Sequence, residues 1–260
     1  MSSLAPSPLS ENSRLVFGGE SARPGQQISA GMAGRWQRAL NRHGKPNSDV
    51  LRCFIHLDHR HRPIEQWRID FPPDLDEAQA RLYERPFRRL FSALGSHKGH
   101  WWVNDQANEA FRTAVSRLER YLITRIDAET PAWQWIQSDR LASAVTLVVA
   151  RDDDFLHGVL QSSAFISWWR HWASRLAPID RVASYPFPWP PARGLSSLSR
   201  VQEDHRLSVA RTARTGDQTS VDLAVDAAYD WPAGLTEGEK LARLEKLNHQ
   251  RSLAPFGFPP

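Results

Sequence analysis

The sequence contains little cysteine, little lysine and no long apolar segment, and each shortage excludes something. Cys53 is the single cysteine, so no disulfide can form within the chain, and a reducing cytoplasm is the expected location. The longest apolar run, residues 145–150, is far too short to cross a bilayer. The polar N-terminus lacks the basic and apolar regions of a signal peptide. The sequence therefore predicts a cytoplasmic protein with no membrane partner.

The shortage of lysine leaves arginine to carry almost all of the positive charge. Lysine accounts for 4 of the 33 basic residues, and the sequence pI is about 9.6. Arginine forms bidentate contacts to phosphate and guanine, although a GC-rich genome would also favour arginine codons. Residues 35–125 hold 17 basic and 11 acidic residues, whereas residues 201–260 hold 7 and 9. A nucleic-acid surface is therefore predicted in or beside the first region.

Hydrophobic periodicity and turn signals predict an α+β fold. We expect a flexible leader over residues 1–13, a mixed α/β domain over residues 14–191 and a helical C-terminal tail over residues 192–260. Pro86 should kink the first long helix, because proline cannot continue a helix interior. Strands are expected at 49–54, 66–71, 121–126, 133–136 and 145–150, and helices at 31–42, 76–94, 106–118, 155–176, 198–214, 220–229 and 236–247.

Two acidic signals mark the starts of helices. The run 152–154, Asp-Asp-Asp, precedes the apolar helix and is expected to cap its N-terminus, where negative charge is favoured. A nuclease metal site would need further carboxylates and a lysine at matching spacing, and the sequence shows no such set. Thr236 and Glu239 have the spacing of a capping box. Both signals are therefore interpreted as structural.

Catalytic motifs are also missing. Cys53, His56, His59 and His61 are residue types that bind zinc, but structural zinc sites draw their ligands as two spaced pairs. A polar loop that contacts phosphate is the preferred interpretation of this string. No glycine-rich cofactor turn, no Asn/Asp-Pro-Pro-aromatic turn and no Gly-x-Ser-x-Gly motif is present. The chain is therefore expected to hold no catalytic residue, metal or cofactor and to lack methyl-transfer activity alone.

Three stretches carry a resemblance through their order and spacing. The first is Pro46-Asn47-Ser48-Asp49-Val50-Leu51-Arg52, continued through residues 62–71 and 82–87. The second runs from residue 152 to a Phe-Pro-aromatic-Pro terminator at residues 186–191, and the third covers residues 223–248. Together they resemble the target-recognition and C-terminal region of MmeI-like adenine-specific DNA methyltransferases, of the type IIL and phage-defence kinds.

The resemblance implies a role in reading DNA. In that family this region reads bases while a catalytic domain, absent from this sequence, flips and methylates an adenine. The chain is therefore expected to be a specificity subunit that binds double-stranded DNA with a separate methyltransferase catalytic subunit, which would carry S-adenosylmethionine. Restriction-modification or phage defence is the expected setting, and other defence-system proteins are further candidate partners. The alternative is a protein-interaction scaffold that no longer reads DNA. It is favoured by the loop at residues 177–184, which is shorter than the corresponding stretch in the family.

Candidate DNA contacts follow from the same region. Arg175, Asp180 and Arg181 come after a tryptophan-rich helix, and rigidly placed arginine and aspartate can read guanine and cytosine. The alternative is that Asp180 and Arg181 pair with each other or with the helix end. The tryptophans at positions 168, 169 and 172 are expected in the core. Contacts to the DNA backbone are predicted for Arg60, Arg62, His97, Lys98, His100 and Trp101.

Overall fold

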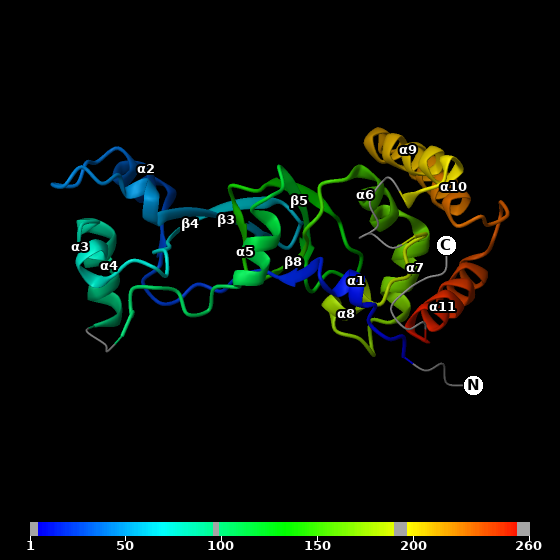
Figure 1. Ribbon diagram of the computed structural model, residues 1–260, viewed down its shortest axis with the longest axis horizontal. Helices are drawn as coiled ribbons and strands as arrows, with labels where there is room; N and C mark the ends of the chain where they lie inside the picture. The colour runs from blue at the N-terminus through cyan, green and yellow to red at the C-terminus, as the bar shows by residue number, and fades with distance from the viewer. Residues whose placement is uncertain (1–4, 96–98, 190–196, 254–260) are drawn as a thin grey trace. The chain divides into compact units, whose positions relative to one another are not determined.

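Figure 1 shows a computed structural model, which describes residues 5–95, 99–189 and 197–253. Helices and strands alternate along the chain and both contribute to its cores, so the predicted α+β class is confirmed. Within the described ranges, every helix is too short or too polar to span a bilayer.

The chain divides into two compact units that interleave along the sequence. Unit 1 comprises Met1–Phe17, Leu118–Trp135 and Leu147–Pro260, and unit 2 comprises Gly18–Arg117 and Ile136–Thr146. This division differs from the predicted boundary at residue 191. The reason is that the helices after that point share a hydrophobic core with segments that precede it, so the helical tail is part of a larger unit.

Unit 2 is built on a four-stranded sheet with the order β2-β4-β3-β7. Strands β3 and β4 form an antiparallel hairpin in which Leu51 lies opposite Ile69 and Leu57 opposite Pro63. Strand β7 pairs with β3 in parallel. Strand β3, predicted to begin at residue 49, begins two residues later because a 3₁₀ turn, η1, precedes it. The bounds are Gln27–Ile28 for β2, Asn47–Val50 for η1, Leu51–Leu57 for β3, Pro63–Ile69 for β4 and Leu141–Ala142 for β7.

Helices α2, α3 and α4 of unit 2 pack on one end of this hairpin around Leu51, Ile69, Phe87 and Trp101. The helix predicted over 76–94 is two helices, because Pro86 in the first turn of the second would clash with the carbonyl four residues earlier. The break therefore falls before the proline. The bounds are Ala30–Gln37 for α2, Glu77–Arg81 for α3, Glu84–Leu94 for α4 and Glu109–Val115 for α5.

Unit 1 has a second four-stranded sheet, in the order β1-β8-β5-β6. Its two central strands are buried almost throughout, as expected for a sheet covered on both faces. The three strands predicted after residue 120 are confirmed within one or two residues. The bounds are Val16–Gly18 for β1, Arg120–Arg125 for β5, Gln134–Gln137 for β6 and Thr146–Val149 for β8.

The apolar helix predicted over 155–176 is also divided in two. Helix α6, Asp154–Gln161, begins at the predicted acidic cap, where the Asp153 carboxylate accepts a hydrogen bond from the Leu156 amide at 2.9 Å. Ser162 is extended and caps helix α7, Ser163–His171, with its hydroxyl accepting from the Phe165 amide at 3.3 Å. Serine competes for backbone hydrogen bonds inside helices, so this side chain starts a new helix.

The predicted helical tail is confirmed. Its helices α9, α10 and α11 have the bounds Arg200–Thr215, Gln218–Ala228 and Glu237–Leu253. The capping box is present, since the Thr236 amide donates to Glu239 at 2.8 Å and the Glu239 amide to Thr236 at 3.3 Å. Gly158 of α6 allows close packing on α9, because a Cβ there would lie 2.7 Å from Val209.

The leader is ordered over more of its length than predicted. Leu9 is buried, and residues Ser10–Ser13 form a short helix, α1. The amide of Asn12 is buried and donates to the carbonyls of Ala183 and Tyr185 at 3.2 and 2.7 Å. These contacts secure the segment from residue 9 onward, because a buried asparagine must find hydrogen-bond partners.

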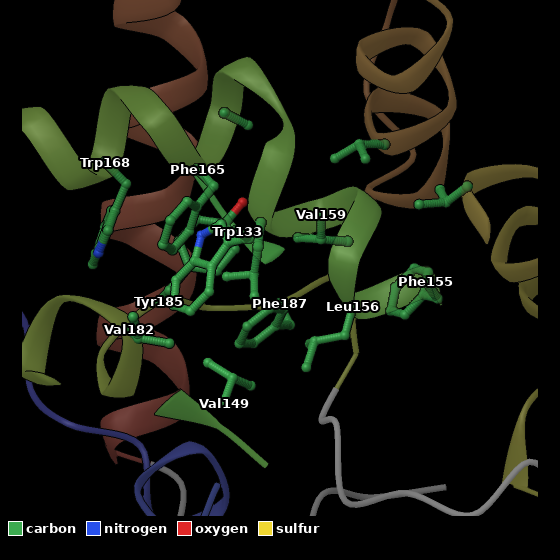
Figure 2. Close-up of a cluster of buried hydrophobic side chains, with 14 of the residues drawn as sticks. Trp133, Val149, Phe155, Leu156, Val159, Phe165, Trp168, Val182, Tyr185 and Phe187 are labelled. Carbon is green, nitrogen blue, oxygen red and sulfur yellow. The ribbon is translucent and has the colours of Figure 1, made fainter. Parts of the chain in front are cut away.

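The core of unit 1 is aromatic, as Figure 2 shows. Trp168, Trp169 and Trp172 are fully buried, which confirms that they are core residues. The indole of Trp168 donates to the Arg181 carbonyl at 2.9 Å and that of Trp169 to the Ala128 carbonyl at 3.1 Å. The rings therefore pack helix α7 onto its neighbours and leave no face for stacking on a base.

Candidate nucleic-acid interface

The predicted base-reading segment is helical. Residues Pro178–Ala183 form helix α8, in which Asp180 lies in the first turn and its carbonyl accepts a hydrogen bond from the Ser184 amide at 2.8 Å. Arg175 precedes the helix and is exposed, with its guanidinium 5.6 Å from the Trp172 ring. No helix was predicted for this segment, but Pro178 suits the first turn of a helix and here starts one.

Arg181 contacts its own unit. Its Nε donates to the Leu176 carbonyl at 3.0 Å and its Nη2 to the Ala173 carbonyl at 3.1 Å, and its guanidinium lies 4.6 Å from the Trp169 ring. Burial lowers the pKa of Arg181. This is the alternative arrangement, in which the arginine binds the carbonyls that follow a helix end. Base reading by Arg175, Asp180 and Arg181 stays a prediction.

We expect Arg181→Ala to lower the free energy of unfolding by about 1–2 kcal/mol, because two charge-assisted hydrogen bonds are lost. Urea unfolding of the variant and the wild type measures this loss. Arg175→Ala is the matched control, since that side chain is exposed and should change stability by less than about 0.5 kcal/mol. An unchanged stability together with loss of sequence-specific DNA binding would instead support base reading by Arg181.

Two predicted backbone contacts lie at the tip of the β3–β4 hairpin. The Asp58 carboxylate accepts from the amides of Arg60 and Arg62, both at 2.8 Å, and from the Arg62 Nε at 2.8 Å. These hydrogen bonds lower the pKa of Asp58 to about 2. Arg62 is therefore ion-paired with Asp58, and the side chains of both Arg60 and Arg62 are exposed.

The other predicted backbone contacts follow helix α4. His97 and Lys98 lie outside the described residues, and His100 is exposed. Trp101 is buried against Phe87 and Phe91, with ring centroids at 5.0 and 5.7 Å. Its ring has no exposed face for DNA, so in this structure Trp101 is a core residue. The hairpin joins this end of unit 2 to its tip through seven paired positions, so the predicted contacts form two separate groups.

A third group of basic residues was missed by the sequence reasoning. Helix α4 buries Phe87 and Leu90 and exposes Arg85, Arg88 and Arg89. The spacing of these arginines, opposite the apolar positions, was the available signal. Helix α2 packs on the same hydrophobic cluster as α4. We call the exposed basic residues of this region that form no ion pair with a described residue the basic end; they are Arg35, Arg38, Lys45, Arg85, Arg88 and Arg89.

The charges of the basic end are not neutralised by described residues, because neighbouring carboxylates have other partners. Asp49 accepts from the Tyr83 hydroxyl at 3.0 Å, and burial, together with this contact, raises the pKa of Tyr83 to about 12. Glu77 pairs with Arg81 at 2.6 Å, and Glu84 with Arg42 at 3.7 Å. Among described residues, the six side chains of the basic end form no ion pair. The surface is therefore suited to a polyanion.

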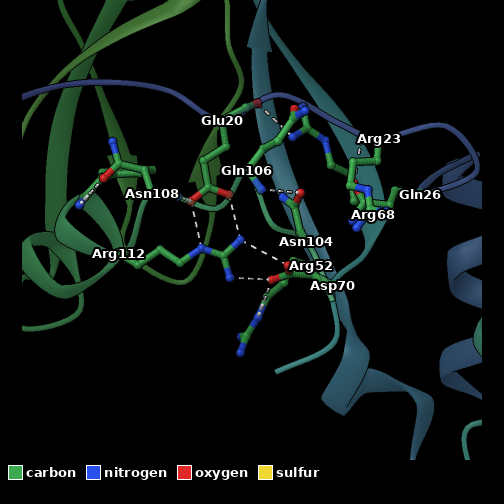
Figure 3. Close-up of polar contacts among 11 residues, drawn as sticks. Glu20, Arg23, Gln26, Arg52, Arg68, Asp70, Asn104, Gln106, Asn108 and Arg112 are labelled. Atoms are coloured by element: carbon green, nitrogen blue, oxygen red, sulfur yellow. Dashed lines mark hydrogen bonds and ion pairs between the residues drawn. The ribbon is translucent and has the colours of Figure 1, made fainter. Parts of the chain in front are cut away.

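The buried charges of unit 2 serve another purpose. Arg112 of α5 binds Glu20 through Nε and Nη2 at 2.7 and 2.6 Å, and binds Asp70 through Nη1 at 2.9 Å (Figure 3). Burial opposes the charge of Arg112, but these hydrogen bonds raise its pKa. Arg68 adds a second buried cation, and burial lowers its pKa to about 10. Both carboxylates are engaged by Arg112, so this network joins three segments of the chain rather than offering a general base.

The described residues contain no candidate metal site. In residues 5–95, 99–189 and 197–253, no three His, Cys, Asp or Glu side chains come together as a group that could hold a metal ion. Cys53 lies on β3 and is buried, and burial raises the pKa of its thiol to about 11. His56 instead faces Ser143, with 3.4 Å between the imidazole Nδ1 and the hydroxyl. The Cys53–His61 string is therefore spread along a strand and a turn.

Comparisons with known proteins identify a similar fold. No protein-family model matches the sequence, and no curated protein matches it. A solved structure of the type IIL restriction-modification enzyme MmeI in complex with DNA is similar, with a TM-score of 0.58 and 13% sequence identity. The match covers 96% of this chain and 36% of MmeI, so this chain spans about a third of the length of that protein. At this identity, the similarity shows the fold alone.

Proposed function

We propose that this chain is a DNA-recognition module that binds duplex DNA through the basic end of unit 2. The observation that carries the proposal is the set of exposed arginines on α2 and α4 that form no ion pair with described residues. Phosphate contacts by such side chains release counterions, which stabilises binding to any sequence. The fold shared with MmeI, solved in complex with DNA, supports this proposal.

The proposal assigns the chemistry to a partner. The chain acts as the specificity subunit of a separate adenine DNA methyltransferase, which binds S-adenosylmethionine, in restriction-modification or phage defence. Such a pair must hold its two halves in register for base flipping. Candidate contacts to the partner include Leu223 of α10, which is exposed, whereas Val225 is buried in the core of unit 1. Other defence-system proteins are further candidate partners.

A scaffold function is the second candidate. It is favoured by Arg181, whose guanidinium binds backbone carbonyls of its own unit. A chain whose base-reading side chains have become structural would retain its protein partners and lose sequence preference.

The DNA-binding proposal is tested by measuring binding to a random-sequence duplex by fluorescence anisotropy over a range of salt concentrations. We expect a Kd below roughly 100 µM at low salt. The triple variant Arg85→Ala, Arg88→Ala, Arg89→Ala should weaken binding and lower the salt slope by about 2 to 3, because three phosphate contacts are lost. The matched control changes three exposed basic residues of unit 1, Arg211, Arg243 and Lys246, to alanine.

The possible outcomes test separately whether the chain binds DNA and whether it does so through the basic end. Equal losses in the two triple variants would show that binding depends on net charge and not on the basic end. No binding by the wild type would reject DNA recognition by the chain alone. Methylation sequencing of cells that express a candidate adenine methyltransferase without its own recognition domain, with and without this chain, tests the subunit assignment; unchanged sites would support the scaffold.

A further inference from the structure

The loop that joins α2 to η1 presents an apolar side chain to solvent. Leu40 is 84% exposed, which makes it the most exposed large hydrophobic residue among those described. Isolated exposed leucines are common on protein surfaces and need no explanation by themselves. What distinguishes this one is the rigidity of the loop and the charge around it.

Two buried asparagines hold the loop in shape. Asn47 is fully buried, and its amide donates to the carbonyls of Trp36 and Ala39 at 3.0 and 3.2 Å. The Asn41 amide donates to the Asn47 side chain at 3.1 Å and to the Lys45 carbonyl. These bonds tie both ends of the loop to one point beneath it. The backbone position of Leu40 is therefore set before any partner binds.

The backbone adds to this rigidity. Leu40 and Pro46 form an antiparallel bridge, and the Gly44 amide donates to the Asn41 carbonyl at 2.9 Å. Gly44 has a φ of 71°, a left-handed conformation that glycine adopts without strain. The loop is thus a tight hairpin, and Leu40 lies on its N-terminal side.

Basic residues flank Leu40 in the sequence. Arg38 and Lys45 belong to the basic end, and Arg42 and His43 are also exposed. Only Arg42 has an acidic neighbour among described residues, Glu84 at 3.7 Å, and its own side chain is 88% exposed. A partner that covers Leu40 must therefore tolerate dense positive charge, which favours a polyanion. Duplex DNA is a polyanion with an apolar interior, its base stack, and it is the polyanion of the proposed function.

We propose that Leu40 is a wedge that inserts between base pairs of duplex DNA while the surrounding basic residues bind the flanking phosphates. Proteins that distort DNA use leucine and other apolar side chains in this way, unstacking one base step and bending the duplex. The energy of unstacking is offset by phosphate contacts that the bent duplex allows. The proposal rests on the proposed DNA-binding function and adds a mechanism to it.

A wedge prefers DNA that is already weakly stacked. We therefore expect the wild type to bind a short duplex with one central mismatch about tenfold more tightly than the fully paired duplex, because part of the unstacking cost is removed. Leu40→Ala should abolish this preference while leaving the salt slope unchanged. The variant should fold normally because the side chain is exposed, and circular dichroism of the variant checks this.

Two controls separate the wedge from general effects. Ile64→Ala removes another exposed aliphatic side chain of unit 2, on β4, and should leave the mismatch preference unchanged. Lys45→Ala should lower the salt slope by about 1 and retain the mismatch preference, because one phosphate contact is lost. A duplex carrying 2-aminopurine beside the mismatch reports unstacking directly through its fluorescence.

The outcomes distinguish the two proposals. A mismatch preference that persists in Leu40→Ala, or that is absent in the wild type, overturns the wedge while DNA binding stands. Failure of the wild type to bind any duplex overturns both proposals. The wedge is supported if Leu40→Ala loses the mismatch preference and gives a weaker 2-aminopurine signal while Ile64→Ala and Lys45→Ala keep the preference.

Discussion

Arg112→Leu is expected to lower the free energy of unfolding by about 3–5 kcal/mol. The guanidinium binds two buried carboxylates, Glu20 and Asp70, and its removal leaves both without their main cationic partner. An uncompensated buried charge is far more costly than the loss of one hydrogen bond. Urea unfolding followed by circular dichroism measures the change.

The control for this variant is Arg117→Leu. Arg117 is exposed and follows the same helix, so its replacement should change stability by less than about 0.5 kcal/mol. Glu20→Gln should be less harmful in the Arg112→Leu background than in the wild type, because the carboxylate is then already unpaired. A loss below about 1 kcal/mol for Arg112→Leu would contradict the view that this network holds unit 2 together.

Trp169→Ala is expected to cost about 3–5 kcal/mol, which is typical of a large aromatic residue removed from a core. The ring is fully buried, and its indole nitrogen donates to the Ala128 carbonyl at 3.1 Å. The substitution therefore leaves both a cavity and an unpaired carbonyl.

Leu223→Ala provides the comparison for Trp169→Ala. This side chain belongs to the same unit but is 55% exposed, so its loss should cost less than about 1 kcal/mol. Chemical denaturation of both variants gives the two values. Equal effects at the two positions would mean that the aromatic core is not what stabilises unit 1.

The features predicted correctly from the sequence are local. The cap at Asp153, the capping box at Thr236 and the existence of a strand that overlaps 66–71 each depend on residues within a few positions of one another. Even where the prediction of one helix over 76–94 was incomplete, Pro86 contained the reason for the break. Local geometry is determined by neighbouring residues, so a sequence pattern is enough to reveal it.

The candidate site was only partly predictable. The basic excess of residues 35–125 was visible in the sequence, but a count of charges does not show which ones are neutralised. Arg62 is bound by Asp58, while Arg85 and Arg88 are exposed without an ion pair to described residues. Trp101, predicted to contact DNA, is covered by Phe87 and Phe91.

The sequence by itself determined the α+β class, the positions of most helices and strands, and the arginine-rich character of the first half. Only the tertiary structure decided which distant segments share a core and which charges meet. Glu20 and Arg112 are 92 residues apart in the chain, yet they bind each other at 2.6 Å. Periodicity shows which face of an element is apolar and does not show what covers it. Such pairings depend on chain topology, because burial and charge neutralisation are properties of the assembled core.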